Sequence, residues 1–246
     1  EDQEGRPAKR EIRTIRGVGS RFEKDGYTHF MEKEIYEQPS VISKTLEHYM
    51  NDNNQVTLGN TPLDFSSIER ITLVACGTAF YACLTAKYWL EKLARIPTDV
   101  DVASEFRYRE PPVAAKTMAI FVSQSGETAD TLAALRYCQG KAAHIWSVTN
   151  VAESSIARES GVDLPIFAGV EIGVASTKAF TCQLTVLLSL VIKAAEDRDQ
   201  IKESERKEIL GAMRSLPSLI NLALDRNEYL RFAANELAHA SDILFL

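Results

Sequence analysis

The sequence predicts an α/β protein with a doubly wound parallel sheet, helices on both faces of the sheet, and further flanking helices. Five short runs are apolar at successive positions, a pattern typical of strands that are buried on both faces of a sheet. Helical patterns separate these runs, and strands joined by helices pair in parallel. With 246 residues, of which 45% are hydrophobic, the chain is also long enough to bury a core.

The chain opens with charged residues of both signs up to residue 27, a composition typical of a solvated linker. Residues 28–49 then place apolar side chains at helical spacing around Pro39, where we expect a break or a kink. A polar loop is expected over residues 51–61.

From residue 71 onward, predicted strands and helices alternate. Each strand is a short apolar run, and we expect the strands at residues 71–76, 98–102, 118–122, 143–148 and 162–167. After every predicted strand, apolar residues recur at helical spacing. We expect these helices from Ala79, after Ser104, over residues 127–139, near residues 154–159, and from Ser176. Residues 203–240 are again predicted to be helical, with Pro217 separating two helices.

The most apolar stretch, residues 184–192, belongs to the helix that starts at Ser176 and is too short to cross a membrane. It is apolar on more than one face, so we expect it to be buried between layers or against a partner. A homodimer is the resulting hypothesis. No signal peptide is visible, and we expect no membrane association.

Charge and cysteine usage disfavour several classes of function. A net charge of −6 and a pI near 5.4 argue against nucleic acids and anionic membranes, because both attract basic surfaces. The cysteines lack CxxC spacing and lie in apolar stretches, as buried thiols of a cytoplasmic protein do: Cys76, Cys83, Cys138 and Cys182. The histidines form no HExxH motif, and neither a Walker loop nor a dinucleotide fingerprint is present. We therefore expect no metal and no cofactor.

Three polar segments follow predicted strands, at residues 76–78, 123–128 and 171–178. In a parallel sheet, ligands bind at the carboxyl ends of the strands, where the following helices point their N-termini. In the second segment, Gly126 lets the backbone approach a ligand, and hydroxyl and helical N–H groups converge. A single serine would more often be a helix cap, but the cluster favours a phosphate site. Glu127 would repel phosphate, so we expect it to point outward.

The other two segments predict groups that line the ligand. Ser176 and the backbone near Val174 suit sugar hydroxyls, whereas a lysine placed like Lys178 is more often solvated than bound to an anion. Cys76 has no base nearby in sequence and is interpreted as a lining residue rather than a nucleophile. Because no Ser-His-Asp set and no acid–base pair is recognisable, the sequence predicts binding and no catalytic residue.

Taken together, these motifs resemble the isomerase half of the glutamine–fructose-6-phosphate aminotransferase (glucosamine-6-phosphate synthase) family, which contains sugar isomerase (SIS) domains. The similar stretches are residues 29–39, 75–78, 103–109, 123–131 and 171–181. They lie within about residues 29–181, and their combination is far more specific than any one motif.

The resemblance implies two sugar isomerase lobes after an N-terminal glutaminase domain. It also implies a reaction that delivers glutamine-derived ammonia to fructose 6-phosphate and isomerises the imine to glucosamine 6-phosphate without a cofactor. Phosphate-binding positions of the family match Ser123, Gln124, Ser125 and Thr128, and positions that line the sugar match Cys76, Thr78, Val174 and Ser176. The predicted substrate-binding set is completed by the neighbouring residues Gly77, Gly126 and Ala175.

On this resemblance, residues 1–27 are a linker from a missing glutaminase domain and residues 28–240 are the first lobe with its flanking helices. Residues 241–246 would start a truncated second lobe. In the family, the missing part supplies the catalytic glutamate, lysine and histidine. We therefore expect the chain by itself to bind phosphosugar weakly or not at all, and not to turn it over.

Two alternatives stay open. A non-catalytic phosphosugar sensor would be favoured by a DNA-binding helix-turn-helix segment, and residues 1–60 contain no convincing one. A free-standing phosphosugar isomerase would need its own acid–base residues. The stretches at residues 32–39 and 171–181 favour the aminotransferase.

Overall fold

The computed structural model describes residues 23–59 and 63–244, which form one five-stranded sheet in the order β2-β1-β3-β4-β5 with every pair parallel. All five predicted strands are present: β1 (Arg70–Ala75), β2 (Thr98–Val102), β3 (Thr117–Ser123), β4 (His144–Thr149) and β5 (Val162–Pro165). Strand β3 is central, and all of its residues are buried. The predicted fold class is confirmed.

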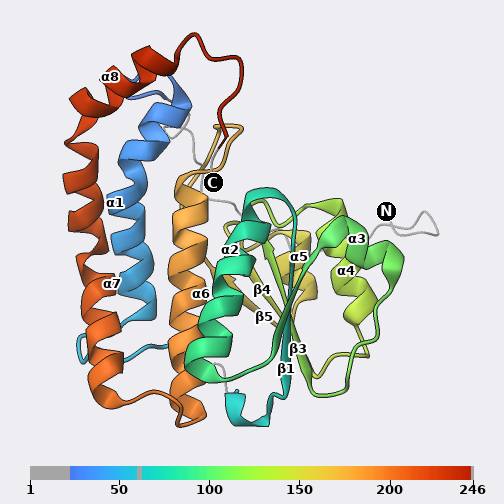
Figure 1. The fold of residues 1–246 in the computed structure, drawn as a ribbon. Coiled ribbons are helices and arrows are strands. Elements are labelled where there is room, and N and C mark those ends of the chain that lie inside the picture. The colour runs from blue at the N-terminus through green and yellow to red at the C-terminus, as the bar shows by residue number, and fades with distance from the viewer. Residues whose placement is uncertain (1–22, 60–62, 245–246) are drawn as a thin grey trace, which may run out of the picture.

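Helices cover both faces of the sheet (Figure 1). One face carries α2 (Gly77–Trp89) and α6 (Lys178–Asp197), and the other carries α3 (Ala103–Arg109), α4 (Ala129–Cys138) and α5 (Ser155–Glu159). A further layer outside α6 consists of α1 (Phe30–Tyr49) and α7 (Glu203–Leu224), followed by α8 (Asn227–Leu237). Two short turns, η2 (Phe65–Ser67) and η3 (Leu90–Ala94), complete the described elements.

Side chains of the central strands divide between two apolar cores, because successive strand residues point to opposite faces. Leu73 and Ile120 join the larger core under α1, α2 and α6. Val74 and Phe121 join the smaller core under α3 and α4. This division explains why the strands are apolar at successive positions rather than at every second one.

The helix α1 continues through Pro39, so the helix does not break at this residue. A proline inside a helix leaves the carbonyl four residues earlier without its N–H donor. Here that carbonyl belongs to Ile35, and it accepts a hydrogen bond from Gln38 Nε2 at 3.0 Å. The side chain thus replaces the missing backbone donor.

The predicted helix boundary at Pro217 is wrong, because α7 runs through this residue to Leu224. Apolar residues on both sides of Pro217 hold α7 against the protein: Met213 is buried, and Ile220 packs against the larger core. Packing on both sides offsets the hydrogen bond that the proline removes.

The apolar helix α6 is long enough and apolar enough to cross a membrane by length and composition, yet 67% of its most apolar window is buried inside the protein. Packing against α1 on one side and α2 on the other covers its apolar faces. Burial of α6 between layers therefore occurs within the chain, and this helix no longer provides an argument for a dimer.

Both predicted domain boundaries stay predictions. Residues 1–22 of the expected linker and residues 245–246 lie outside the described residues. Residues 241–244 form neither helix nor strand in the structure, so the predicted start of a second lobe is not visible there.

Candidate functional site

The candidate site lies where β1 and β3 end side by side and the chain leaves them toward opposite faces of the sheet. After β1 the chain enters α2, and after β3 it enters α4. Such a switch point opens a crevice at the carboxyl ends of parallel strands. The structure has a cavity of about 340 Å³ here, lined by the ends of both strands and by the loop before α6.

Nine of the eleven predicted substrate-binding residues line this cavity: Cys76, Gly77, Thr78, Ser123, Gln124, Ser125, Thr128, Val174 and Ser176. The other two, Gly126 and Ala175, are not among the lining residues of the cavity. The fold therefore gathers residues about 100 positions apart in sequence, as expected from parallel strands that end at one edge. Their contact with a ligand stays a prediction.

The loop of residues 123–128 is closed by its own hydroxyl groups. Ser123 Oγ accepts a hydrogen bond from the backbone N–H of Gly126 at 3.0 Å and lies 3.0 Å from Thr128 Oγ1. Ser125 Oγ accepts a hydrogen bond from the backbone N–H of Glu127 at 3.2 Å. The turn is thus held in shape before any ligand arrives, with the Ser125 side chain exposed and Thr128 half-buried at the cavity.

Gly126 lies against the residue that precedes α5. Its φ of +66° is a left-handed conformation that favours glycine, and a Cβ atom there would lie 2.0 Å from Ser154 Oγ. Ser154 is the residue before α5, and its side chain caps that helix. Gly126 therefore lets the loop pack against the start of α5, and its approach to a ligand stays a prediction.

Glu127 points away from the cavity, as expected. Its Oε1 accepts a hydrogen bond from the backbone N–H of Ser155 at 2.7 Å, at the start of α5. This hydrogen bond lowers the pKa of the Glu127 carboxyl below its ordinary value. The charge of Glu127 is thereby paired with the N-terminus of α5 instead of facing a phosphate.

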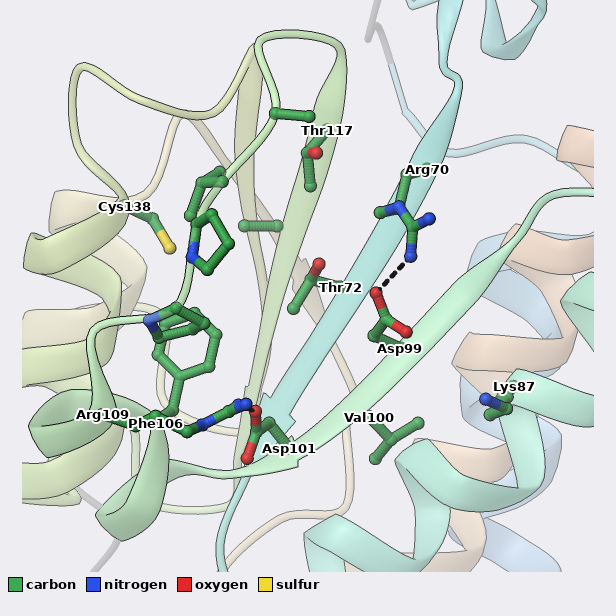
Figure 2. A pocket seen from close by; sticks show the side chains of 15 residues that line it. Arg70, Thr72, Lys87, Asp99, Val100, Asp101, Phe106, Arg109, Thr117 and Cys138 are labelled. Carbon is green, nitrogen blue, oxygen red and sulfur yellow. Dashed lines mark hydrogen bonds and ion pairs between the residues drawn. The ribbon is translucent and has the colours of Figure 1, made fainter.

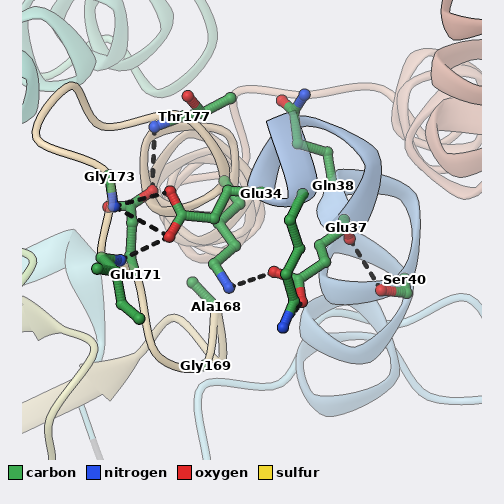
Figure 3. A network of polar contacts seen from close by, with 12 residues as sticks. Glu34, Glu37, Gln38, Ser40, Ala168, Gly169, Glu171, Gly173 and Thr177 are labelled. Carbon is green, nitrogen blue, oxygen red and sulfur yellow. Dashed lines mark hydrogen bonds and ion pairs between the residues drawn. The ribbon is translucent and has the colours of Figure 1, made fainter. Parts of the chain in front are cut away.

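The third polar segment is held by the carboxylate of Glu34, which comes from α1 and is 2% exposed. It accepts hydrogen bonds from the backbone N–H groups of Ile172 at 2.5 Å and Gly173 at 3.1 Å (Figure 3). A Cβ atom on Gly173 would lie 2.5 Å from Glu34 Oε2, so a larger residue there would displace the carboxylate. Glu34 was not identified from the sequence, because its charge in a helix suggests a solvated position.

A second carboxylate, Glu171, closes the same segment onto α6. It accepts hydrogen bonds from the backbone N–H groups of Thr177 at 3.0 Å and Ala179 at 3.1 Å, and from Ser176 Oγ at 3.0 Å. The side chain of Thr177, the residue before α6, makes no capping hydrogen bond. Glu171 therefore caps α6 and sets the position of Ser176 beside the cavity.

Lys178 is not solvated, and it is not among the residues that line the cavity. It is 3% exposed, and its Nζ lies 2.5 Å from Glu37 Oε2 of α1. The expectation of a solvated lysine was wrong because Lys178 is buried against α1, where the partly exposed Glu37 pairs with its charge. This ion pair and the Glu34 contacts tie α1 to the segment that precedes α6.

The cysteines divide into one lining residue and three core residues. Cys76 is half-buried and lines the cavity, while Cys83, Cys138 and Cys182 are buried free thiols. Burial raises the pKa of Cys138 and of Cys182 to about 11, so neither is a reactive thiolate at neutral pH.

A larger cavity, of about 510 Å³, lies near the amino ends of β1 and β3 (Figure 2). Four of its charged side chains pair with one another: Arg70 lies 2.5 Å from Asp99, and Arg109 contacts Asp101. None of the predicted substrate-binding residues lines it. We therefore place the candidate site at the smaller cavity, where the polar groups converge on open space.

Comparison with known proteins agrees with this fold. Residues 64–193 match the SIS domain family. Two curated relatives are glutamine–fructose-6-phosphate aminotransferases (isomerizing), from Brucella abortus biovar 1 at 46% identity and from Mesorhizobium japonicum at 48% identity. Each alignment covers 100% of this chain and 40% of the relative, so the chain spans well under half the length of these relatives.

A solved structure is also similar, namely the C-terminal domain of glucosamine-fructose-6-phosphate aminotransferase from Francisella tularensis. It superposes with a TM-score of 0.84 at 38% identity and covers 88% of this chain and 61% of that chain. The family match covers more than half of the chain, including the whole sheet and the 123–128 loop. On this evidence, the chain belongs to the SIS domain family.

Proposed function

We propose that this chain is the sugar phosphate-binding lobe of a glutamine–fructose-6-phosphate aminotransferase. Such an enzyme converts fructose 6-phosphate and glutamine into glucosamine 6-phosphate and glutamate. The observation that carries the proposal is the convergence of the 123–128 loop and the 171–177 segment on one cavity at the switch point of the sheet. Similarity to aminotransferases over the full length of this chain supports this enzyme over a sensor or a free-standing isomerase.

In this proposal, the 123–128 loop binds the phosphate. The hydroxyls of Ser125 and Thr128 donate to phosphate oxygens, together with backbone N–H groups of the first turn of α4. Thr128 precedes α4 but makes no side-chain capping bond, so that helix end has no side-chain acceptor of its own. Across the cavity, Thr78 and Ser176 face the sugar.

Proton transfer is proposed to depend on groups outside this chain. Glu171 is the one carboxylate among the described residues that line the cavity. Its oxygens already accept hydrogen bonds from Thr177, Ala179 and Ser176. A general base needs a free lone pair directed at the substrate. We therefore propose that the chain alone binds the sugar phosphate without isomerising it.

Calorimetric titration with fructose 6-phosphate and glucosamine 6-phosphate tests the binding role. We expect weak but saturable binding, because groups outside this chain complete the site. Ser125→Ala and Thr128→Val should each weaken it about tenfold or more, because each removes a hydroxyl that bonds a charged group. Glucosamine and inorganic phosphate, each carrying half of the ligand, should bind more weakly.

Ser215→Ala provides the matched control, because Ser215 is exposed on α7 and bonds only within that helix. It should bind as the unsubstituted chain does. If the folded chain does not bind, or if the two loop variants bind as tightly as the unsubstituted chain, the proposal fails.

We also propose that the protein is a cytoplasmic homodimer. The cytoplasmic location is supported by three buried free thiols, which are typical of proteins from a reducing compartment.

The dimer is supported by large apolar side chains that are exposed along α7 and α8: Leu219, Leu222, Tyr229, Leu230 and Phe232. Light scattering should give twice the 27.4 kDa of the chain, and Phe232→Glu should lower that mass by opposing the contact. A monomer at every concentration would contradict the dimer.

A further inference from the structure

Gln183 is a residue of the candidate site that the sequence patterns did not single out. It lies in the second turn of α6, is 1% exposed, and its side chain lines the same cavity as Cys76 and Ser176. Among the described residues, none donates a hydrogen bond to its Oε1. A buried polar amide thus borders the site with its acceptor unused.

An amide oxygen buried without a donor destabilises a protein, and native interiors seldom contain one without a reason. In the part of the chain that the structure describes, Thr117 Oγ1 is the one other buried side-chain oxygen of this kind. Thr117 lies at the opposite end of β3, in the larger cavity of Figure 2. Unpaired buried oxygens are thus rare among the described residues, and one of them belongs to a residue that lines the candidate site. General packing does not explain this position.

We propose that Gln183 binds a hydroxyl group of the sugar and thereby distinguishes sugar phosphates from other phosphates. This inference rests on the proposed function. A hydroxyl both donates and accepts, so it can pair with either end of the amide, whichever way the amide is turned. The oxygens of a dianionic phosphate ester only accept hydrogen bonds, and the hydroxyls of the 123–128 loop are available to donate to them.

The local structure holds Gln183 in place for this role. Its helix begins at Lys178, and Glu171 bonds the backbone of both Thr177 and Ala179 at that end. Glu171 also accepts a hydrogen bond from the hydroxyl of Ser176. One carboxylate therefore sets the position of the sugar-lining segment relative to the helix that carries Gln183, and a prepositioned group loses less entropy on binding.

A packing role and a ligand role predict different responses to Gln183→Met, which keeps the length of the side chain and removes the amide. If Gln183 only fills space, the thermal midpoint and the ligand affinity should stay unchanged or fall together. If it binds the sugar, removal of the unused acceptor should leave the midpoint unchanged or raise it by a few degrees. The affinity for fructose 6-phosphate should fall about tenfold.

The experiment is calorimetric titration of the 246-residue chain and of Gln183→Met with fructose 6-phosphate and with inorganic phosphate, beside thermal unfolding without ligand. We expect Gln183→Met to lose affinity for the sugar phosphate alone. Thr117→Val, the matched control, removes the other unpartnered oxygen and should bind both ligands normally. If Gln183→Met does not fold, Gln183→Asn tests the same ratio of sugar phosphate to phosphate affinity.

The outcomes separate the two proposals. Failure of the unsubstituted chain to bind fructose 6-phosphate would overturn the proposed function. Normal binding by that chain together with an unchanged affinity ratio in the Gln183 variants would overturn only the role of Gln183. A parallel fall of the thermal midpoint and of the affinities for both ligands would assign Gln183 to packing and would also overturn the inference.

Discussion

Gly126→Ala is expected to abolish sugar phosphate binding and to lower the free energy of unfolding by about 2–4 kcal/mol. Two effects add at this position. Alanine is strained at a φ of +66°, and its Cβ would lie 2.0 Å from Ser154 Oγ and 2.4 Å from Ser154 Cβ. The 123–128 loop must therefore move away from α5, which breaks the bond between the Gly126 N–H and Ser123 Oγ. Denaturant unfolding and calorimetric titration measure the two losses.

Gly140→Ala is the matched control for this substitution. Gly140 has a φ of +73°, but a Cβ atom there would meet no atom within 4 Å. It shares the backbone strain without the clash, so we expect a loss of about 1 kcal/mol and unchanged ligand binding. Equal losses in the two variants would show that contact with Ser154 does not constrain the loop.

Glu34→Ala is expected to lower the free energy of unfolding by about 3 kcal/mol, because two partly buried backbone N–H groups lose a charged acceptor. Those groups belong to Ile172 and Gly173, which lead into the segment that lines the sugar side of the cavity. Affinity for fructose 6-phosphate should therefore fall at least fivefold as Val174 and Ser176 lose their fixed positions. Affinity for inorganic phosphate should change little.

The control for Glu34→Ala is Glu47→Ala, which removes an exposed glutamate from the same helix. Its effect on unfolding should stay within about 0.5 kcal/mol. The two measurements are urea unfolding and titration with both ligands. Unchanged affinity for fructose 6-phosphate in Glu34→Ala would mean that the 171–177 segment keeps its shape without this carboxylate.

Local patterns were sufficient for the sheet and for much of the site. The run from Met118 to Val122 is apolar at every position, and only a strand buried on both faces accounts for such a run in a βα repeat. The polar cluster at residues 123–128 follows this strand directly, so it had to lie at the ligand edge of a parallel sheet. In both cases, residues close in sequence carry the information.

Both prolines show where a local rule is insufficient. Pro39 and Pro217 each remove one helical hydrogen bond, which is the reason to expect a break. In α1 the side chain of Gln38 bonds the freed carbonyl, and in α7 residues on both sides of the proline pack against the core. Whether a proline ends a helix therefore depended on contacts that its neighbours make in the folded protein.

By itself, the sequence determined the fold class, the five strands, and a loop of hydroxyl-bearing residues at the end of the third strand. Only the tertiary structure assigned Glu34, Lys178 and Gln183 to the site and its support. The bonds from Ile172 to Glu34 and from Lys178 to Glu37 join residues 138 and 141 positions apart. Whether such a side chain is buried, and which residue it pairs with, depends on how the helices pack around the sheet. The spacing of residues along one helix does not predict that packing.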